Sequence, residues 1–182
     1  MPVPPDVRDR IARVLDAARR SSPPGAARWV GPDAFHLTIR FLGATPADRV
    51  AGAAEAVVEA ARGSREFEIA LHGSGAFPRP AEPRTLWLGV SAGGADLAAL
   101  AVRLDGALAT RGWVSEGRPF RAHLTLARCE DPRGGLAAAA ALAAAASRFA
   151  ASWRAGSLVL YESHLGRGPA RYVVVAEAPF GR

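Results

Sequence analysis

A chain of 182 residues suits one domain or two small, tightly joined lobes, and the lack of a long apolar run or a secretory signal pattern predicts a cytoplasmic location. Its one cysteine, Cys129, excludes an internal disulfide and a thiolate metal site. The formal net charge of +6 rests on 23 arginines, without any Lys, Asn or Gln, so it indicates a GC-rich coding bias and gives only mild support for a nucleic-acid partner.

The sequence begins with a pattern typical of an amphipathic helix. Apolar residues recur at helical spacing over 7–18, behind Asp6 as the expected N-cap, and the Ser/Pro/Gly-rich segment 21–25 ends the pattern. A second helix is predicted from Thr45-Pro46, a cap followed by a first-turn proline, up to Gly63.

Between these helices the apolar period changes to two, which predicts a half-buried strand over 35–41. One face of this strand carries Phe35, Leu37, Ile39 and Phe41. The other face carries His36, Thr38 and Arg40. The strand therefore presents an imidazole and a hydroxyl on one face, separated by roughly 6.5 Å.

The rest of the chain alternates strands and helices without a flexible linker. The expected elements are a strand at 67–71, a Gly/Pro-rich connection at 72–84, a strand at 85–90, a helix through 97–108, a strand at 120–127, a helix at 136–151 and strands at 158–162 and 172–176. This order predicts a single α+β domain over 1–182.

The tripeptide His-Leu-Thr occurs twice, as His36-Leu37-Thr38 and His123-Leu124-Thr125, with an offset of 123 − 36 = 87 residues. The chain contains only four His and five Thr, so coincidence is a poor explanation. Shifting the helix expected near 96–110 by this offset places it over most of the first helix, which indicates an internal repeat. The same shift moves the strand at 85–90 to the very start of the chain, so we expect that a short apolar strand is missing before Met1.

The repeated tripeptide suits acid–base chemistry at a phosphate. A single histidine in a strand is usually structural, and the repetition is what favours catalysis. His36 and His123 can exchange protons near neutral pH, one neutral and one cationic, while Thr38 and Thr125 can hold phosphoryl oxygens. No Asp, Glu or Cys stands near them at metal-ligand spacing, so the predicted hydrolysis of a cyclic phosphodiester needs no metal and no cofactor. The repeat makes the two imidazoles interchangeable, and His36 as the acid is our working hypothesis.

At these residues the sequence resembles the two-histidine (2H) phosphoesterase superfamily, and within it the RNA 2',3'-cyclic phosphodiesterases, historically called 2'-5' RNA ligases. The resemblance covers nearly the whole chain. It includes, besides the two tripeptides, Phe41-Leu42-Gly43, Gly75-Ala76-Phe77-Pro78, Leu86-Trp87-Leu88-Gly89, Pro119-Phe120 and Arg171-Tyr172. It implies a bilobal, pseudo-two-fold α+β fold, with two antiparallel sheets forming a V-shaped cleft and helices outside, and a product that carries a 2'-phosphate.

The family pattern extends the second motif to His-x-Thr-x-x-Arg, which implies that Arg128 contacts a substrate phosphate. Strict alternation puts Arg128 on the opposite face from His123, so this role requires the strand to end or bulge near Ala127. Arg40 has the favourable parity, although an exposed arginine is also the ordinary expectation. Three aromatic residues are candidates for stacking on a nucleobase, with one such contact at most expected. They are Phe77, Phe120 and Tyr172.

Two other interpretations stay open. One is a phosphodiesterase acting on small cyclic nucleotides or ADP-ribose cyclic phosphate, and the other is an RNA-binding module without catalysis. The expected partners are RNA ends or small cyclic phosphates, with no membrane and no obligate protein partner, so a monomer is predicted. Weak ATP-independent 2',5' ligation is chemically allowed as the reverse reaction.

Overall fold

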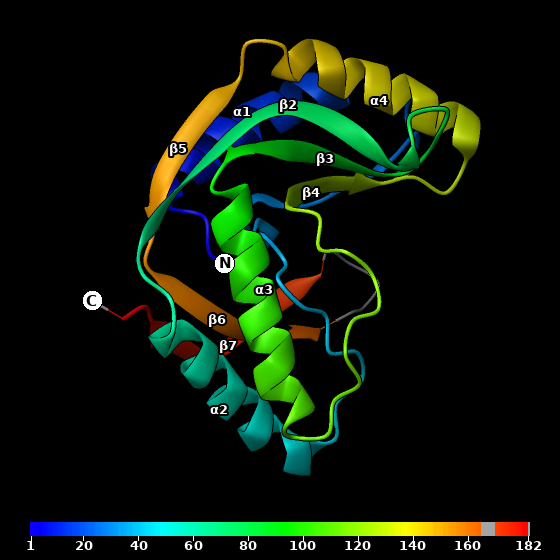
Figure 1. Cartoon of the computed structure of the whole chain (residues 1–182). Helices are drawn as coiled ribbons and strands as arrows, with labels where there is room; N and C mark the ends of the chain where they lie inside the picture. Colours follow the sequence, from blue (N-terminus) through cyan, green and yellow to red (C-terminus); the bar gives the residue numbers. More distant parts are fainter. Residues whose placement is uncertain (165–169, 182) are drawn as a thin grey trace.

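The computed structural model describes residues 1–164 and 170–181 and has α+β architecture (Figure 1). In chain order the elements are α1 (Pro5–Arg20), β1 (Arg28–Trp29), the 3-10 helix η1 (Pro32–Ala34), α2 (Ala47–Arg62), β2 (Phe67–Arg79), β3 (Glu82–Ala92), α3 (Gly94–Ala109), β4 (His123–Arg128), α4 (Pro132–Ala146), β5 (Ala150–Ala155), β6 (Ser157–His164) and β7 (Arg171–Pro179). A five-stranded sheet has the order β1-β4-β3-β2-β5, and β6 pairs with β7. Every pairing is antiparallel, so the predicted fold class is confirmed.

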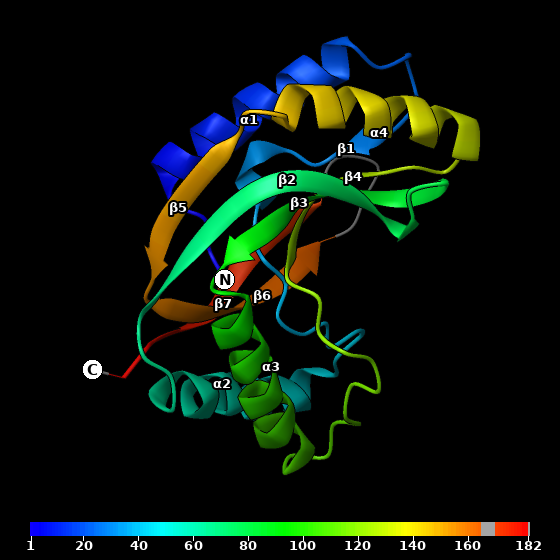
Figure 2. The same cartoon turned by 45° about the horizontal axis from the view of Figure 1, so that its top comes forward.

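The helices lie outside the sheets. Figure 2 shows α1 and α4 side by side on the outer face of the curved five-stranded sheet, where α4 contacts β2 and β3. The α2 helix packs against α3 and covers the β6–β7 pair. The helical period predicted for α1 is confirmed by its buried residues, which are Val7, Ile11, Leu15 and Ala18.

The expected helix caps differ from those of the structure. Asp6 lies in the first turn of α1, and Pro4 is the N-cap residue. The α2 helix likewise begins after Pro46, while the Thr45 hydroxyl donates to the Gly43 carbonyl (3.3 Å). Both helices thus start without a side-chain cap. An N-cap proline with its fixed φ sets the backbone conformation just before each first turn.

The connection expected at 72–84 is wrong: this segment belongs to the long β2–β3 hairpin. Its glycines and prolines do not interrupt the strands, because register shifts in β2 accommodate them, including one between Leu71 and Ser74 next to Gly73, whose φ is 71°. Glycine is needed there, since other side chains rarely adopt a positive φ. The irregular strand curves strongly over the sheet in Figure 1.

The helix expected at 136–151 is also too long, because α4 ends at Ala146 and β5 follows as the edge strand beside β2. The sequence of β5 continues the alanine-rich run without a β-branched residue, so its composition favoured helix. At the other end, the Asp131 side chain caps α4 by accepting from the Gly134 amide (2.6 Å). The β4 strand begins at His123 rather than at residue 120.

The strand expected over 35–41 forms only isolated bridges. Leu37 pairs antiparallel with Leu124 on one side. On the other side the Met1 amino group donates to the Leu37 carbonyl (2.9 Å) and the Leu37 amide donates to the Met1 carbonyl (3.1 Å). A regular strand needs partners along its length, and this pairing is too short to provide them.

Burial in this segment follows the predicted alternation only as far as Ile39. Phe35, Leu37 and Ile39 are buried. Phe41, expected on the same face, is 73% exposed. The chain bends at Ile39, which ends the extended course that the period of two requires.

We propose that the chain is one bilobal domain built from an 87-residue repeat. Shifting α3, β4 and α4 by this offset gives 7–22, 36–41 and 45–59, which fall on α1, the His36 segment and α2. The β6–β7 pair shifts to 70–77 and 84–92, within β2 and β3. A single cluster of buried side chains from both halves supports this division into lobes of one domain.

Two helical glycines predict opposite stability effects. Gly106→Ala in α3 should raise the free energy of unfolding by about 0.5–1 kcal/mol, because a Cβ there meets open space and alanine favours helix. Gly135→Ala in α4 should lower it by about 1–3 kcal/mol, because a Cβ would lie 2.7 Å from the Pro83 carbonyl oxygen. Urea unfolding followed by circular dichroism measures both. Stabilisation by both substitutions would show that α4 does not pack closely on β3.

Candidate active site

The bridge between Leu37 and Leu124 brings the two repeated motifs together. Both leucines are fully buried, so the residues flanking them point to the opposite face. In an antiparallel pair the flanking residues then stand opposite each other, His36 beside Thr125 and Thr38 beside His123. Diagonal neighbours in such a pair are about 7–8 Å apart, which gives the two imidazoles a separation that one phosphate can span. We call this side of the two segments the histidine face.

Each imidazole is held by a backbone carbonyl two residues upstream. The Nδ1–H of His36 donates to the Ala34 carbonyl (2.8 Å), and the Nδ1–H of His123 donates to the Arg121 carbonyl (2.7 Å). A carbonyl only accepts, so both neutral rings carry their proton on Nδ1 and keep a lone pair on Nε2. The Thr38 hydroxyl lies 3.0 Å from Nε2 of His36 and donates to it. Both rings thus offer Nε2 for proton transfer.

Two tyrosines border His36. The Tyr172 ring is edge-on to the imidazole with centroids 4.7 Å apart, and Tyr161 lies at 5.8 Å. Burial lowers the pKa of His36 below its ordinary value of 6.5, and the hydrogen bond to the Ala34 carbonyl opposes this effect only in part. His36 is therefore neutral down to a lower pH than a solvent-exposed histidine.

The surroundings of His123 are different. The Phe77 ring is edge-on at 4.9 Å, Trp87 lies at 6.4 Å, and the Arg121 guanidinium stands over the Phe77 ring at 5.8 Å. The indole crosses Gly75 so closely that a Cβ there would lie 2.3 Å from it. Trp87 pairs in register with Thr125 and so shares the histidine face. Its sequence position alone does not mark Trp87 as a site residue, because a tryptophan in a strand is ordinarily a core residue.

The three aromatic candidates for base stacking thus lie in different places. Tyr172 borders His36, and Phe77 borders His123. Phe120 is half-buried and packs against the core. The structure therefore brings two of the three next to the histidines.

The bulge that Arg128 requires is present. The register between β3 and β4 shifts between Leu86 and Trp87, and consecutive residues Leu126 and Ala127 are both buried. This shift reverses the parity of the strand and turns Arg128 to the same side as His123. Its Nη1 lies 3.5 Å from the Thr85 hydroxyl, and it forms no ion pair with the described residues.

Arg40 forms ion pairs within the protein. Its side chain is 12% exposed, and its guanidinium pairs with Asp105 (3.6 Å) and with Glu116. Two carboxylates offset its charge, so the favourable parity does not make it a phosphate ligand.

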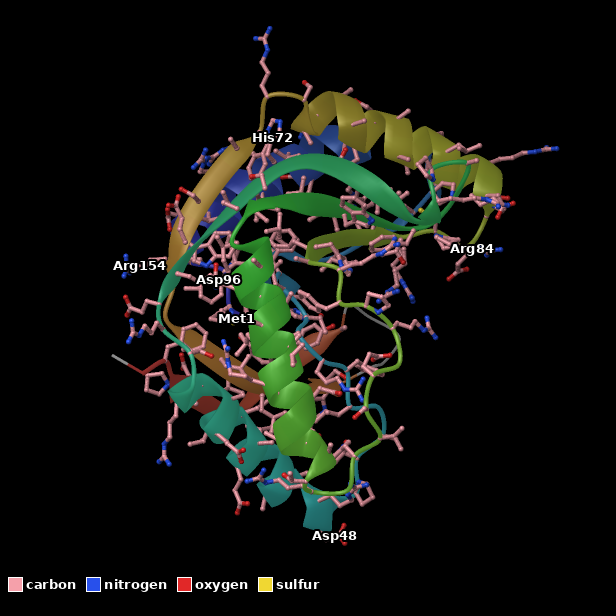
Figure 3. All side chains as sticks on the ribbon, in the orientation of Figure 1. Met1, Asp48, His72, Arg84, Asp96 and Arg154 are labelled. Carbon is pink, nitrogen blue, oxygen red and sulfur yellow. The ribbon has the colours of Figure 1, made fainter. Side chains whose placement is uncertain are left out.

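The other polar groups considered lie away from the histidine face. Figure 3 shows His72 at the outer side of β2 near β5, where Nδ1 hydrogen-bonds the Phe149 carbonyl (3.0 Å). His164 lies 3.5 Å from Glu162. Burial raises the pKa of the Cys129 thiol.

Within 1–164 and 170–181, no three His, Cys, Asp or Glu side chains are grouped to hold a metal ion, and no helix is long and apolar enough to cross a membrane.

Comparisons with known proteins agree with this geometry. The family described as the 2'-5' RNA ligase superfamily matches residues 4–167. The chain belongs to this superfamily. This result confirms the resemblance stated from the two His-Leu-Thr motifs.

Several relatives within the superfamily carry the name RNA 2',3'-cyclic phosphodiesterase. The Aeropyrum pernix protein is 34% identical over 124 residues, covering 68% of each chain. The Escherichia coli protein is 30% identical over 172 residues, covering 93% of this chain and 88% of its own length. A crystal structure from Thermus thermophilus superposes with a TM-score of 0.74 at 26% identity, covering 98% of this chain and 93% of that one.

The half-buried position of His36 predicts its titration. We expect an NMR midpoint below 6.5 for His36 in the native protein, because burial disfavours the imidazolium. Tyr172→Ala should raise this midpoint by exposing the ring, whereas Phe77→Ala, beside the other histidine, should leave it unchanged. A native midpoint at or above 6.5 would contradict the prediction.

Proposed function

We propose that the chain hydrolyses 2',3'-cyclic phosphates at RNA ends to 2'-phosphates by acid–base catalysis from His36 and His123. The observation that carries this proposal is the pairing of the two His-Leu-Thr segments through their central leucines, with each Nδ1 engaged by a carbonyl and a lone pair left on each Nε2. The names of the relatives support the same reaction. A cytoplasmic, monomeric enzyme without a cofactor remains our expectation.

The reaction requires two proton transfers and one displacement. One imidazole takes a proton from water as the water oxygen forms a bond to phosphorus. The bond from phosphorus to the ribose 3'-oxygen breaks, and the other imidazole, as imidazolium, protonates that oxygen. The product has a 3'-hydroxyl and a 2'-phosphate, and a proton passes between the histidines through solvent to restore the starting state.

Three side chains are assigned to the phosphate. Thr38 and Thr125 are each opposite one histidine, where their hydroxyls can donate to the nonbridging oxygens as negative charge develops. The 3.0 Å bond from the Thr38 hydroxyl to His36 must break for this to occur. Arg128, turned to the same side by the bulge, supplies a positive charge that suits bidentate contact.

Removing either histidine should lower the rate by about 100- to 10,000-fold, because each supplies one proton transfer. The test follows cleavage of a short RNA with a 2',3'-cyclic phosphate by phosphorus NMR, with a chelator present, for the native protein, His36→Ala and His123→Ala. His72→Ala is the matched control, since this histidine lies outside the site. We expect a 2'-phosphate product and an unchanged rate for the control.

Other outcomes of this experiment point elsewhere. A 3'-phosphate product would contradict the proposed bond cleavage, and loss of turnover with the chelator would contradict metal-independent catalysis. Binding of RNA ends without turnover, with or without added metal, would favour the non-catalytic module.

The lowered pKa of His36 favours its neutral form and hence the role of base, whereas the working hypothesis makes His36 the acid, so the assignment has its own test. Replacing the 3'-oxygen of the cyclic phosphate by sulfur gives a leaving group that needs no protonation. We therefore expect His36→Ala to lose much less activity on the sulfur analogue than on the natural substrate, measured as the ratio of kcat/KM values, while His123→Ala is equally impaired on both. Rescue of His123→Ala instead would reverse the two roles.

A further inference from the structure

Two apolar side chains are exposed where residues 38–46 run beside residues 110–116. Phe41 is 73% exposed and Val114 is 86% exposed. Arg40 ties the two segments together, since its guanidinium donates to the Val114 carbonyl (2.6 Å) and pairs with Glu116. Figures 1 and 2 both show these segments side by side below β4. A fixed loop therefore presents an aromatic ring to solvent close to the end of the first motif.

Arg49, in the first turn of α2, lies against the indole of Trp113. Its Cζ is 3.9 Å from the ring centroid, and Nη2 donates to the Arg111 carbonyl (3.3 Å). Arg40 and Arg111 nearby each pair with two carboxylates. Arg49 pairs with no carboxylate of the described chain, so its charge is available to a ligand.

A cavity of about 290 Å³ lies between these segments. Its lining includes Arg40, Leu42, Thr45, Arg49, Trp113 and Val114. This volume lies just below the range of about 300–1,000 Å³ for small-ligand sites and can hold no more than about one nucleoside unit. The cavity therefore combines a flat cation, an aromatic neighbour and the right size for a base.

The position of the cavity relates it to the histidine face. Arg40 stands four residues beyond His36 and two beyond Thr38, so at roughly 3.3 Å per residue its Cα is at most about 13 Å from the Cα of His36. A cyclic phosphate is the 3' terminus of an RNA, so the rest of the strand extends only in the 5' direction. The nucleotides on the 5' side are therefore the part of a strand that can occupy a cavity beyond the histidine face.

We propose that Phe41, Arg49 and Trp113 form a binding site for the nucleotides that precede the cyclic phosphate end of a single-stranded RNA. Bases stack on the exposed Phe41 ring and on the Arg49 guanidinium plane over Trp113, and the charge of Arg49 attracts the phosphates. This inference rests on the proposed function and specifies its substrate as an RNA strand rather than a small cyclic nucleotide.

The test compares two substrates with the same terminal nucleotide, a 2',3'-cyclic mononucleotide and a single-stranded pentanucleotide with a 2',3'-cyclic end. The native protein should have the higher kcat/KM on the pentanucleotide. Phe41→Ala and Arg49→Ala should each lower that value by about 5- to 100-fold and leave the mononucleotide value unchanged. Arg148→Ala, an exposed arginine in the turn between α4 and β5, is the matched control and should change neither.

Each result separates the two proposals. If the native protein cleaves neither substrate, the proposed function fails whatever the variants do. If it cleaves both equally well and Phe41→Ala changes nothing, the RNA surface is overturned while the proposed function stands. A Phe41→Ala variant that loses activity equally on both substrates would also overturn the surface, because the loss would then come from the histidine face or from the fold. Phe41 carries the test because its exposed side chain is replaceable without unfolding.

Discussion

The antiparallel contact between Leu37 and Leu124 is the constraint on which the candidate site depends. It joins two segments that are 87 residues apart, and burial of both leucines fixes which side of each segment faces solvent. A slip of one residue in either segment would turn its histidine into the core and its leucine outwards. The free energy gained by burying two leucines therefore also aligns four polar side chains. In this way the hydrophobic core specifies the geometry of the candidate catalytic groups.

The same repeat gives two histidines with different properties because their neighbours differ. Both rings have the same carbonyl bond at Nδ1, so the backbone treats them alike. The neighbouring side chains differ between the two rings. Tyrosines from the β6–β7 pair border His36, whereas Phe77 and Trp87 from the five-stranded sheet flank His123. Acid–base catalysis needs two groups in different protonation states at one pH, and unequal environments can provide them. Different neighbours around a repeated motif are thus sufficient to give its two histidines different chemical environments.

The sequence alone predicted best those features that depend on residues close together in the chain. Helical periods and, for α4, the alanine-rich composition predicted the four α-helices of the described chain, and the repeated tripeptide identified the histidines that the structure brings together. Features that depend on distant partners were missed: the β2–β3 hairpin absorbs glycines through register shifts, and β5 is a strand because β2 lies beside it. Trp87 was missed for a related reason, since only its register opposite Thr125 distinguishes it from a core residue. The bulge before Arg128 was anticipated only as a requirement, because alternation alone cannot locate an extra residue.

The net charge follows from the composition, whereas the binding of a charged ligand depends on where the charged side chains stand. A chain whose basic residues are all arginine has a high net charge without any particular affinity, and the described residues pair five of these arginines with carboxylates: Arg8, Arg40, Arg79, Arg111 and Arg154. Arg40 and Arg111 each face two carboxylates, whereas Arg49 and Arg128 have no carboxylate partner among the described residues. These two lie at the proposed surface for upstream nucleotides and at the proposed phosphate site. Attraction of an RNA end therefore depends on where the unpaired guanidinium groups stand and not on the net charge of +6, and its screening by salt should reflect those few contacts.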